Sequence, residues 1–534
     1  MKILSAAEAA LLVEDGDTIL IGGSGGGHSV PDALMEAVEQ RFLATRQPRN
    51  LCCVHPVGLG DRDRKGASRF AHPGLLKRIV CGAFVDSPPI AAMAASNLIE
   101  AYTLPQGALS QLIREIAAGR PGLITHVGLN TFIDPRHGGG RQSETAIEPL
   151  VEIIRLGDRD WMFYQPFKID VAFIRGTTAD EDGNISMEHE AVYGEMLSMA
   201  QATRNSGGLV LAQVKRMAAR DSLPGKSVKV PGMLVDAVIV EPDQSQTFRT
   251  QYDAAYAGEI RVPVGSLPQL PLDARKIVAR RCALELTPGA ICNIGSGIST
   301  GLPLIAAEEG ILDHIVLTNE QGVVGGIPVD GYDFGAGRNY SALIDQPYQF
   351  DFYDGGGIDL AYLSAAEIDR NGNVNISRFA DKIIGVGGFV NISQNAKKVM
   401  FSGTFTAGGL QVACGEGGLK IVNEGRSRKF VESVNQVSFS GRYSAERRQE
   451  VLFITERAVF RLINGELELI EIAKRVSLEN DILAQMDFAP KISASLKPMD
   501  ERLFGSGPMG ILAELAGAEP PVHPRLRSGR RIAA

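Results

Sequence analysis

The sequence contains few residues that bind metal ions or form cross-links. It has 6 cysteines and 8 histidines in 534 residues, with no CxxC pair and no two histidines at metal-ligand spacing. We therefore predict no metal site and no disulfide framework. Most cysteines lie in apolar runs typical of strands, which favours buried free thiols in a reducing compartment. They are Cys52, Cys53, Cys81, Cys282, Cys292 and Cys414.

Long apolar runs and an excess of basic charge are also absent. No apolar stretch reaches the roughly 20 residues that span a bilayer, and residues 1–8 carry no secretion signal but begin an amphipathic helix pattern. These absences predict a cytoplasmic protein with no membrane contact. The net charge of −8 argues against a nucleic-acid binder, which normally carries a basic stripe.

A weak internal repeat indicates the architecture. Residues 16–25 resemble residues 289–297, and each segment predicts a turn, a short strand, a glycine loop and a helix. Residues 169–174 and 358–363 likewise resemble each other, and each predicted strand is followed by an Asp-Gly or Asn-Gly turn into another strand. Two repeated pairs in the same order indicate duplication of one module.

Strand and helix patterns alternate between these landmarks. Residues 33–43 and 108–118 predict helices, whereas residues 209–212 and 398–401 predict strands. This alternation predicts an α/β fold of two tandem related α/β domains with largely parallel sheets. We place the domains at residues 1–270 and 273–516, separated by a proline-containing segment before a helix from Asp273, and predict a disordered tail at 517–534.

One carboxylate stands apart from other charges. The apolar residues 315–317 predict a buried strand, Glu320 follows it, and a glycine-rich loop comes next. Strand C-terminal ends in α/β proteins carry reacting groups, and an ionised carboxylate can act as a nucleophile. Taken alone, the segment leaves a loop-solvated or helix-capping glutamate as an equal alternative.

Three glycine clusters, at residues 22–27, 295–297 and 385–391, are candidates for binding phosphates through backbone N–H groups. Taken singly, each cluster is more often a device for tight packing. The first cluster fails the GxGxxG spacing and the second lacks its third glycine, so the sequence disfavours a dinucleotide-binding domain.

These motifs together resemble the family I coenzyme A transferases, of the single-chain acetate/propionate and 3-ketoacid type. The resemblance extends from Met1 to about Leu515. In chain order, it is carried by the loop at 22–27 with Pro31, Leu104-Pro105-Gln106-Gly107, residues 131–140, Arg204-Asn205-Ser206-Gly207-Gly208, the Glu320 segment, residues 403–409 and residues 454–460.

The resemblance implies roles for individual residues. Glu320 matches the catalytic glutamate, Gln106 would donate its side-chain amide to an oxyanion, and the backbone N–H of Gly388 would be the second donor. Without the resemblance, Gln106 would be interpreted as a solvated turn residue after Pro105. The residues expected to hold CoA are Gly295, Ser296, Gly297, Gly387, Gly388 and Asn391, and those expected to line the substrate pocket are Gly25, Gly26, Gly27 and Gly322.

The implied activity is transfer of CoA between a short-chain acyl-CoA and a free acid such as acetate, propionate or acetoacetate. It would proceed through a glutamyl-CoA thioester, in a homodimer or homotetramer, without a resident cofactor. Asn319 and Gln321 differ from the neighbours common in ketoacid enzymes, which leaves the acyl group open. Two alternatives remain: a short-chain acyl-CoA hydrolase, and a non-catalytic protein that binds CoA or another ligand.

Overall fold

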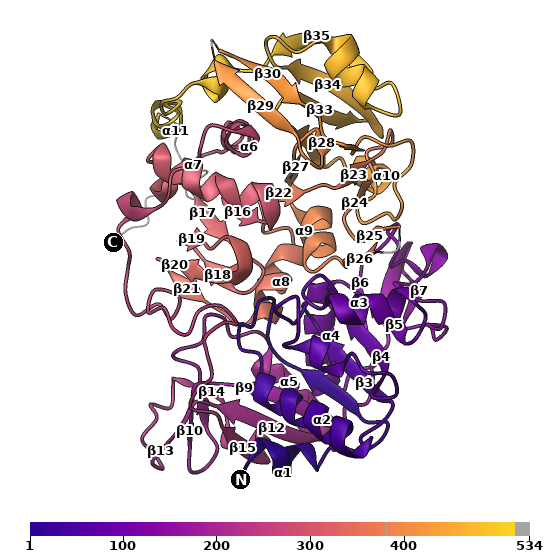
Figure 1. Ribbon diagram of the computed structural model, residues 1–534, viewed down its shortest axis with the longest axis vertical. Helices are drawn as coiled ribbons and strands as arrows, with labels where there is room; N and C mark the ends of the chain where they lie inside the picture. The colour runs from indigo at the N-terminus through magenta and orange to yellow at the C-terminus, as the bar shows by residue number, and fades with distance from the viewer. Residues whose placement is uncertain (381, 416, 518–534) are drawn as a thin grey trace.

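The computed structural model describes residues 1–380, 382–415 and 417–517, which form two α/β halves (Figure 1). The first half occupies the lower part of Figure 1 and the second half the upper part. The predicted tail at 517–534 lies, except for Gly517, outside the described residues. The helix expected from Asp273 is present as α6 (Ala274–Ala283), and the Asp273 side chain caps its first turn. The proposed domain limits themselves stay a prediction.

An eight-stranded sheet, parallel throughout, forms the centre of the first half. Strand β9 is buried along its whole length, as is typical of a parallel strand covered on both faces. In spatial order the strands are β1 (Lys2–Leu4), β15 (Ala237–Val240), β12 (Leu209–Val214), β9 (Val171–Arg175), β2 (Thr18–Ile21), β3 (Leu51–His55), β4 (Leu76–Cys81) and β5 (Glu100–Thr103). The helices are α1 (Ala6–Ala10), α2 (Asp32–Thr45), α3 (Pro88–Ala95), α4 (Gln106–Ala117) and α5 (Met196–Asn205).

A ten-stranded sheet forms the centre of the second half, and its five consecutive strands from β17 to β32 are parallel. In spatial order its strands are β21 (Ala342–Leu343), β18 (Val323–Val324), β17 (Val316–Thr318), β16 (Ile291–Ile294), β22 (Leu360–Ser364), β27 (Lys398–Ser402), β32 (Glu450–Ile454), β33 (Ala458–Ile463), β34 (Glu466–Ile472) and β35 (Lys491–Pro498). Besides α6, the helices are α7 (Leu302–Glu308), α8 (Gln346–Asp354), α9 (Phe389–Asn395), α10 (Gly441–Glu446) and α11 (Leu512–Ala516).

The two sheets repeat one strand order. The first contains β15-β12-β9-β2-β3 and the second contains β32-β27-β22-β16-β17, so the two repeated sequence pairs fall on equivalent strands. The expected turns also recur, because β10 (Thr178–Asp180) pairs with β11 (Ile185–Ser186) as β23 (Glu367–Ile368) pairs with β24 (Val374–Asn375). The predicted fold class is therefore confirmed: mixed α/β with large, mostly parallel sheets.

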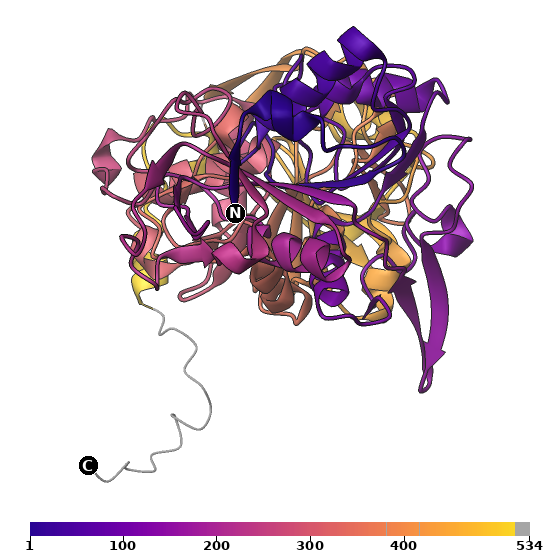
Figure 2. The ribbon, with the colours of Figure 1, turned by 90° about the horizontal axis from the view of Figure 1, so that it is seen from below.

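Smaller sheets decorate both halves. In the first half they contain β13 (Arg216–Ala218) and β14 (Val228–Val230), beside β10 and β11, and separately β6 (Leu123–Thr125), β7 (Val151–Leu156) and β8 (Arg159–Tyr164). In the second half the pairs are β19 (Ile327–Pro328) with β20 (Gly337–Arg338), β25 (Arg378–Phe379) with β26 (Lys382–Ile383), β28 (Thr406–Ala407) with β31 (Ser427–Arg428), and β29 (Gln411–Gly415) with β30 (Gly418–Asn423). The β7–β8 hairpin projects from the side of the molecule (Figure 2).

The halves are joined through α4, which packs against α8 and α9. Arg114 on α4 makes two hydrogen bonds to Asp351 on α8, at 2.6 and 2.7 Å. The half-buried Asp354 carboxylate accepts from Gln111 at 3.0 Å and from Asn391 at 3.0 Å. Burial raises the pKa of Asp354 to about 7, although these amide donors oppose the shift. These contacts hold the middle and the last turn of α4 against the second half.

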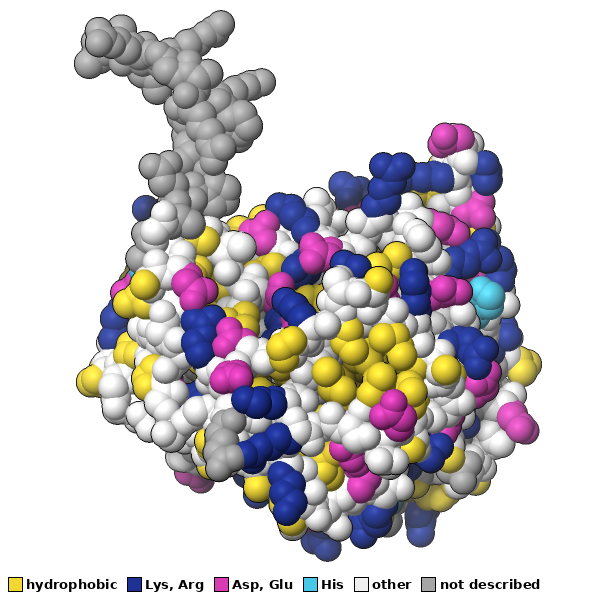
Figure 3. All heavy atoms as spheres, turned by 90° about the horizontal axis from the view of Figure 1, so that it is seen from above, with side chains coloured by type: hydrophobic (Ala, Val, Ile, Leu, Met, Phe, Trp, Pro, Cys, Tyr) yellow, Lys and Arg dark blue, Asp and Glu magenta, His cyan; other side chains and the backbone are white. Residues whose placement is uncertain are grey.

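Charges of both signs are mixed on one face of the molecule. On the face shown in Figure 3, acidic and basic side chains are interspersed around a group of hydrophobic side chains and form no continuous basic stripe. Throughout the described part of the chain, no helix is long and apolar enough to cross a membrane. Among the same residues, no cluster of three or more His, Cys, Asp or Glu side chains could hold a metal ion. All six cysteines are free.

Candidate active site

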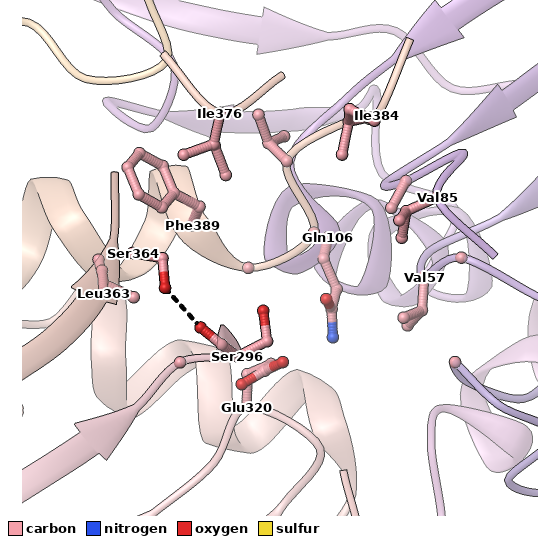
Figure 4. A pocket seen from close by; sticks show the side chains of 18 of the residues that line it. Val57, Val85, Gln106, Ser296, Glu320, Leu363, Ser364, Ile376, Ile384 and Phe389 are labelled. Atoms are coloured by element: carbon pink, nitrogen blue, oxygen red, sulfur yellow. Dashed lines mark hydrogen bonds between the residues drawn. The ribbon is translucent and has the colours of Figure 1, made fainter. Parts of the chain in front are cut away.

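A cavity of about 350 Å³ lies between the halves, with Gln106 and Glu320 directed into it (Figure 4). The first half contributes Gly25, Val57, Gly58, Ala83, Val85, Asp86 and Gln106. The second half contributes Gly295, Ser296, Glu320, Gln321, Phe334, Leu363, Ser364, Ala365, Ala366, Ile376, Ile384, Gly385, Val386, Gly387, Gly388, Phe389 and Ile392. No Lys, Arg or His occurs in this described lining, and Asp86 and Glu320 are its charged groups.

Glu320 stands in the turn that follows β17. Asn319 shapes this turn: its side-chain oxygen accepts from the Gln321 N–H at 3.0 Å, and its amide donates to Gly335 O at 2.9 Å. Gly322 adopts φ +101°, and a Cβ there would collide with Ile344 O. The turn therefore needs glycine at 322 and holds Glu320 at the cavity wall.

The Glu320 carboxylate is buried and incompletely hydrogen-bonded. The residue is 8% exposed, and its Oε2 has no hydrogen-bond partner among the described residues. Burial raises the pKa of Glu320 to about 6, opposed by its own backbone N–H and by the Gln321 and Asn293 side chains. Asn293 is anchored from behind, since its amide donates to the Tyr353 hydroxyl at 3.2 Å. At neutral pH the carboxylate is mainly ionised, with one oxygen available to react.

Gln106 is the first residue of α4 and is 1% exposed. Its backbone N–H donates to Gly387 O at 2.9 Å, and its side-chain nitrogen donates to Gln346 Oε1 at 2.9 Å. An amide nitrogen carries two hydrogens, so this bond leaves the second N–H of Gln106 for a ligand. The solvated-turn interpretation of Gln106 is wrong, because the side chain is buried and bonded across the two halves.

Gly387 and Gly388 separate Gln106 from Glu320. A Cβ on Gly387 would lie 3.4 Å from Gln106 Oε1, and a Cβ on Gly388 would lie 3.2 Å from Glu320 Cγ. The Gly387 N–H donates to Gly82 O at 2.8 Å, whereas the Gly388 N–H has no acceptor among the described residues. The Gly388 N–H, which the resemblance implies as a backbone donor, is thus left free for a ligand.

The structure places the remaining predicted residues in two groups. Gly25, Gly295 and Ser296 line the cavity. The others do not, and each has a packing role: a Cβ on Gly26 would collide with Tyr332 O, one on Gly27 would lie 2.5 Å from the Phe248 backbone N, and one on Gly297 would lie 2.6 Å from Ser364 Oγ. Asn391 also lies outside the lining, because its side chain bonds Asp354 and accepts from the Gly107 N–H at 3.1 Å.

Two groups at this site were not predicted. Apolar side chains from both halves form one wall, with Val57, Val85, Ile376, Ile384 and Phe389 (Figure 4). Asp86 is the second carboxylate, and burial raises its pKa to about 6 while Arg62, at 3.7 Å, opposes the shift. An isolated acid after the apolar residues 83–85 repeats the pattern around Glu320, and that signal could have identified Asp86.

Comparison with known proteins identifies the scaffold. Residues 3–241 match the family model described as Coenzyme A transferase. The chain is 44% identical over 518 residues to the acetate CoA-transferase YdiF of Escherichia coli O157:H7, covering 97% of this chain and 98% of that protein. This chain belongs to the coenzyme A transferase family. The resemblance of its motifs is thereby confirmed, and the enzyme is a CoA-transferase.

Two further comparisons agree with this assignment. The caffeate CoA-transferase of Acetobacterium woodii is 44% identical over 516 residues, covering 94% of this CoA-transferase and 97% of the relative. A crystal structure of the E. coli O157:H7 acyl-CoA transferase YdiF, a thioester complex with CoA, matches with a TM-score of 0.91 at 44% identity. That match covers 95% of this chain and 97% of the other.

Proposed function

We propose that this CoA-transferase moves CoA between a short-chain acyl-CoA and a free monocarboxylic acid through a covalent thioester on Glu320, in ping-pong order. The observation that carries the proposal is Glu320 itself: a buried carboxylate with one unpartnered oxygen, in a cavity shared by the two halves. The crystal structure of E. coli YdiF is a thioester complex with CoA, and this similarity supports a covalent intermediate in the present enzyme.

The first half-reaction consists of two successive substitutions at carbonyl carbons. The Glu320 carboxylate attacks the acyl-CoA carbonyl carbon, the C–S bond breaks, and a mixed anhydride and the CoA thiolate form. The thiolate then attacks the Glu320 carbonyl carbon, and the anhydride C–O bond breaks. The first acid leaves as a carboxylate, and CoA stays attached to Glu320 as a thioester. The second acid reverses these steps.

Each attack places negative charge on a carbonyl oxygen, and the site offers two N–H donors for it. One is the free backbone N–H of Gly388, and the other is the second amide N–H of Gln106. A preorganised donor of this kind lowers a barrier by roughly 3–4 kcal/mol. Binding energy from the distant parts of CoA would help to form the strained anhydride.

The cavity lining supports uncharged acyl groups. The wall containing Val57, Ile384 and Phe389 is apolar, and the described lining contains no cation that could hold a second carboxylate. Asp86 would repel such a group. These features favour acetate, propionate and similar monocarboxylic acids. A cytoplasmic homodimer or homotetramer remains the predicted form of the enzyme.

The test is product analysis by mass spectrometry with acetyl-CoA and propionate. We expect propionyl-CoA and acetate to form in equal amounts while free CoA stays low, because an enclosed site keeps water from the anhydride and thioester. Equal thiol release with and without propionate would contradict the proposal and indicate the hydrolase alternative. A protein that binds acetyl-CoA without forming either product would indicate the non-catalytic alternative.

A further inference from the structure

Behind Gln106, a chain of hydrogen bonds runs away from the cavity into the interface between the halves. Gln106 donates to Gln346 Oε1 at 2.9 Å. Gln346 in turn donates to Glu195 Oε2 at 2.7 Å and to Ser110 Oγ at 2.6 Å. Ser110 completes the cluster by donating to Glu195 Oε2 at 3.0 Å. All four residues are at most 1% exposed, and only Gln106 lines the cavity.

Glu195, at the end of this hydrogen-bond chain farthest from the cavity, determines which groups donate and which accept. A primary amide can present either its oxygen or its nitrogen to a neighbour. A carboxyl group at position 195 accepts the Gln346 N–H, so Gln346 must turn its oxygen toward Gln106. Gln106 must then turn its nitrogen toward Gln346, which leaves its second N–H without an acceptor among the described residues. If Gln346 were reversed, Gln106 would present its carbonyl oxygen and the site would lose a donor.

We propose that Glu195, acting through Gln346, is a positioning residue that fixes Gln106 as a hydrogen-bond donor toward the reacting carbonyl oxygen. The proposal rests on the proposed function, since it assumes that Gln106 stabilises an oxyanion. Glu195 lies outside the cavity lining. It precedes α5, and its only side-chain partners among the described residues are Ser110 and Gln346.

Burial of the cluster explains why the arrangement is maintained. Glu195 Oε1 has no hydrogen-bond partner among the described residues, so Oε2 carries both bonds. Burial raises the pKa of Glu195 to about 8, with the nearby Asp345 adding to the shift and Ser110 opposing it. A neutral carboxylic acid still accepts through its carbonyl oxygen. The donor-to-acceptor order of the hydrogen bonds is therefore the same whichever protonation state Glu195 adopts.

A double-mutant cycle tests the inference. We would measure kcat and KM for acetyl-CoA with propionate in Gln106→Ala, Glu195→Leu and the combined variant. Gln106→Ala should lower kcat by roughly 100- to 1000-fold, the usual loss for one oxyanion donor. Glu195→Leu should lower kcat by about tenfold or more with KM for acetyl-CoA unchanged, and should cause no further loss in the Gln106→Ala background.

A variant that exchanges the side chains at positions 195 and 346 distinguishes loss of positioning from loss of folding. In Glu195→Gln/Gln346→Glu, a carboxyl group at 346 still accepts from Gln106, so kcat should recover to near the wild-type value. The thermal melting of every variant is measured alongside. If the kcat losses of Glu195→Leu and Gln106→Ala multiply in the combined variant, the positioning role of Glu195 is wrong. A swap variant that folds but stays slow would also overturn that role. Neither result would contradict the proposed function. An unimpaired Gln106→Ala would instead remove Gln106 from the proposed mechanism.

Discussion

Gly388 lies directly against Glu320: a Cβ added at Gly388 would stand 3.2 Å from Glu320 Cγ and 3.2 Å from Ile392 Cδ1. The Gly388 φ of −80° is ordinary for any residue, so the close approach rather than the backbone conformation requires glycine there. The same residue carries the free N–H of the proposed oxyanion site. Because Gly388 has no side chain, its N–H can lie close to the Glu320 side chain.

Gly388→Ala should therefore slow thioester formation. The added methyl group must displace Glu320 or the Gly388 N–H by a few tenths of an ångström. A misplacement of reacting groups by about 1 Å costs on the order of 100-fold in rate, and we expect a loss of up to that size. Rapid mixing with acetyl-CoA followed by mass analysis measures the rate. Gly265→Ala is the matched control, because a Cβ there meets nothing within 4 Å. Unchanged rates in both variants would contradict the tight contact.

Activity should fall on the acid side of pH 6. Burial raises the pKa of Glu320 to about 6, and only the ionised carboxylate attacks the thioester. We expect kcat/KM for acetyl-CoA to level off above pH 7 and to fall about tenfold per unit well below pH 6. Enzyme exposed to each acid pH is returned to pH 7.5 to confirm that its activity recovers, and the pH profile is then measured. A profile that stays flat down to pH 5 would show that Glu320 has a much lower pKa.

Removing the charge of Glu320 should stabilise the fold. Its pKa rises from the ordinary 4.5 to about 6 on folding, so the ionised form is disfavoured by about 2 kcal/mol. The folded state binds this proton more tightly, so stability is lost as pH rises from 4.5 through 6. Glu320→Gln should raise Tm at pH 7.5 by on the order of 2 °C, and the gain should shrink toward pH 4.5.

The control for that measurement is Glu479→Gln, at an exposed glutamate outside the cavity. It should leave Tm unchanged at both pH values. A lower Tm for Glu320→Gln at pH 7.5 would mean that the ionised carboxylate stabilises the folded state, contrary to its burial.

Dicarboxylic acids should be poor acceptors. Two like charges about 10 Å apart at an effective dielectric constant of 20 repel by about 1.7 kcal/mol, so Asp86 alone predicts discrimination of more than tenfold. We expect propionate to be used well and succinate poorly at pH 7.5. Asp86→Asn should narrow the difference, and Asp63→Asn, at an exposed position outside the lining, should not. Equal use of the two acids by the wild-type enzyme would contradict this account of the cavity.

Local patterns were sufficient to predict several central strands, the repeat and the turn that carries Glu320. Buried parallel strands are continuous apolar runs, so β9, β12 and β27 were recognisable in the sequence. The edge strand β1 was missed, because its pairing with β15 joins residues more than 230 positions apart and residues 1–8 were interpreted as the start of a helix. Ser5 in fact begins the helix, with a capping box to Glu8.

The glycine-rich loops show why site residues are harder to assign. Gly25 and Gly26 are neighbours, yet Gly25 lines the cavity whereas Gly26 makes room for Tyr332 O. That difference depends on a segment in the other half of the molecule, so the neighbouring residues in the sequence do not indicate it. The same holds for Gln346, whose importance follows from its bonds to Gln106 and Glu195 across the two halves. Glu320 was recognisable in the sequence as a candidate nucleophile, and the family resemblance added Gln106 and Gly388. The residues behind them, Gln346 and Glu195, were not predicted.

The most direct test of the account is the intact mass of the protein after incubation with acetyl-CoA and no acceptor acid. The thioester on Glu320 should add one CoA with loss of one water and release one acetate, and added propionate should remove the adduct as propionyl-CoA. Glu320→Ala should show neither adduct nor turnover, and Glu320→Asp should lose on the order of 100-fold because its carboxylate is misplaced. An unchanged mass in the active wild-type enzyme, or the same adduct in Glu320→Ala, would contradict the central claim.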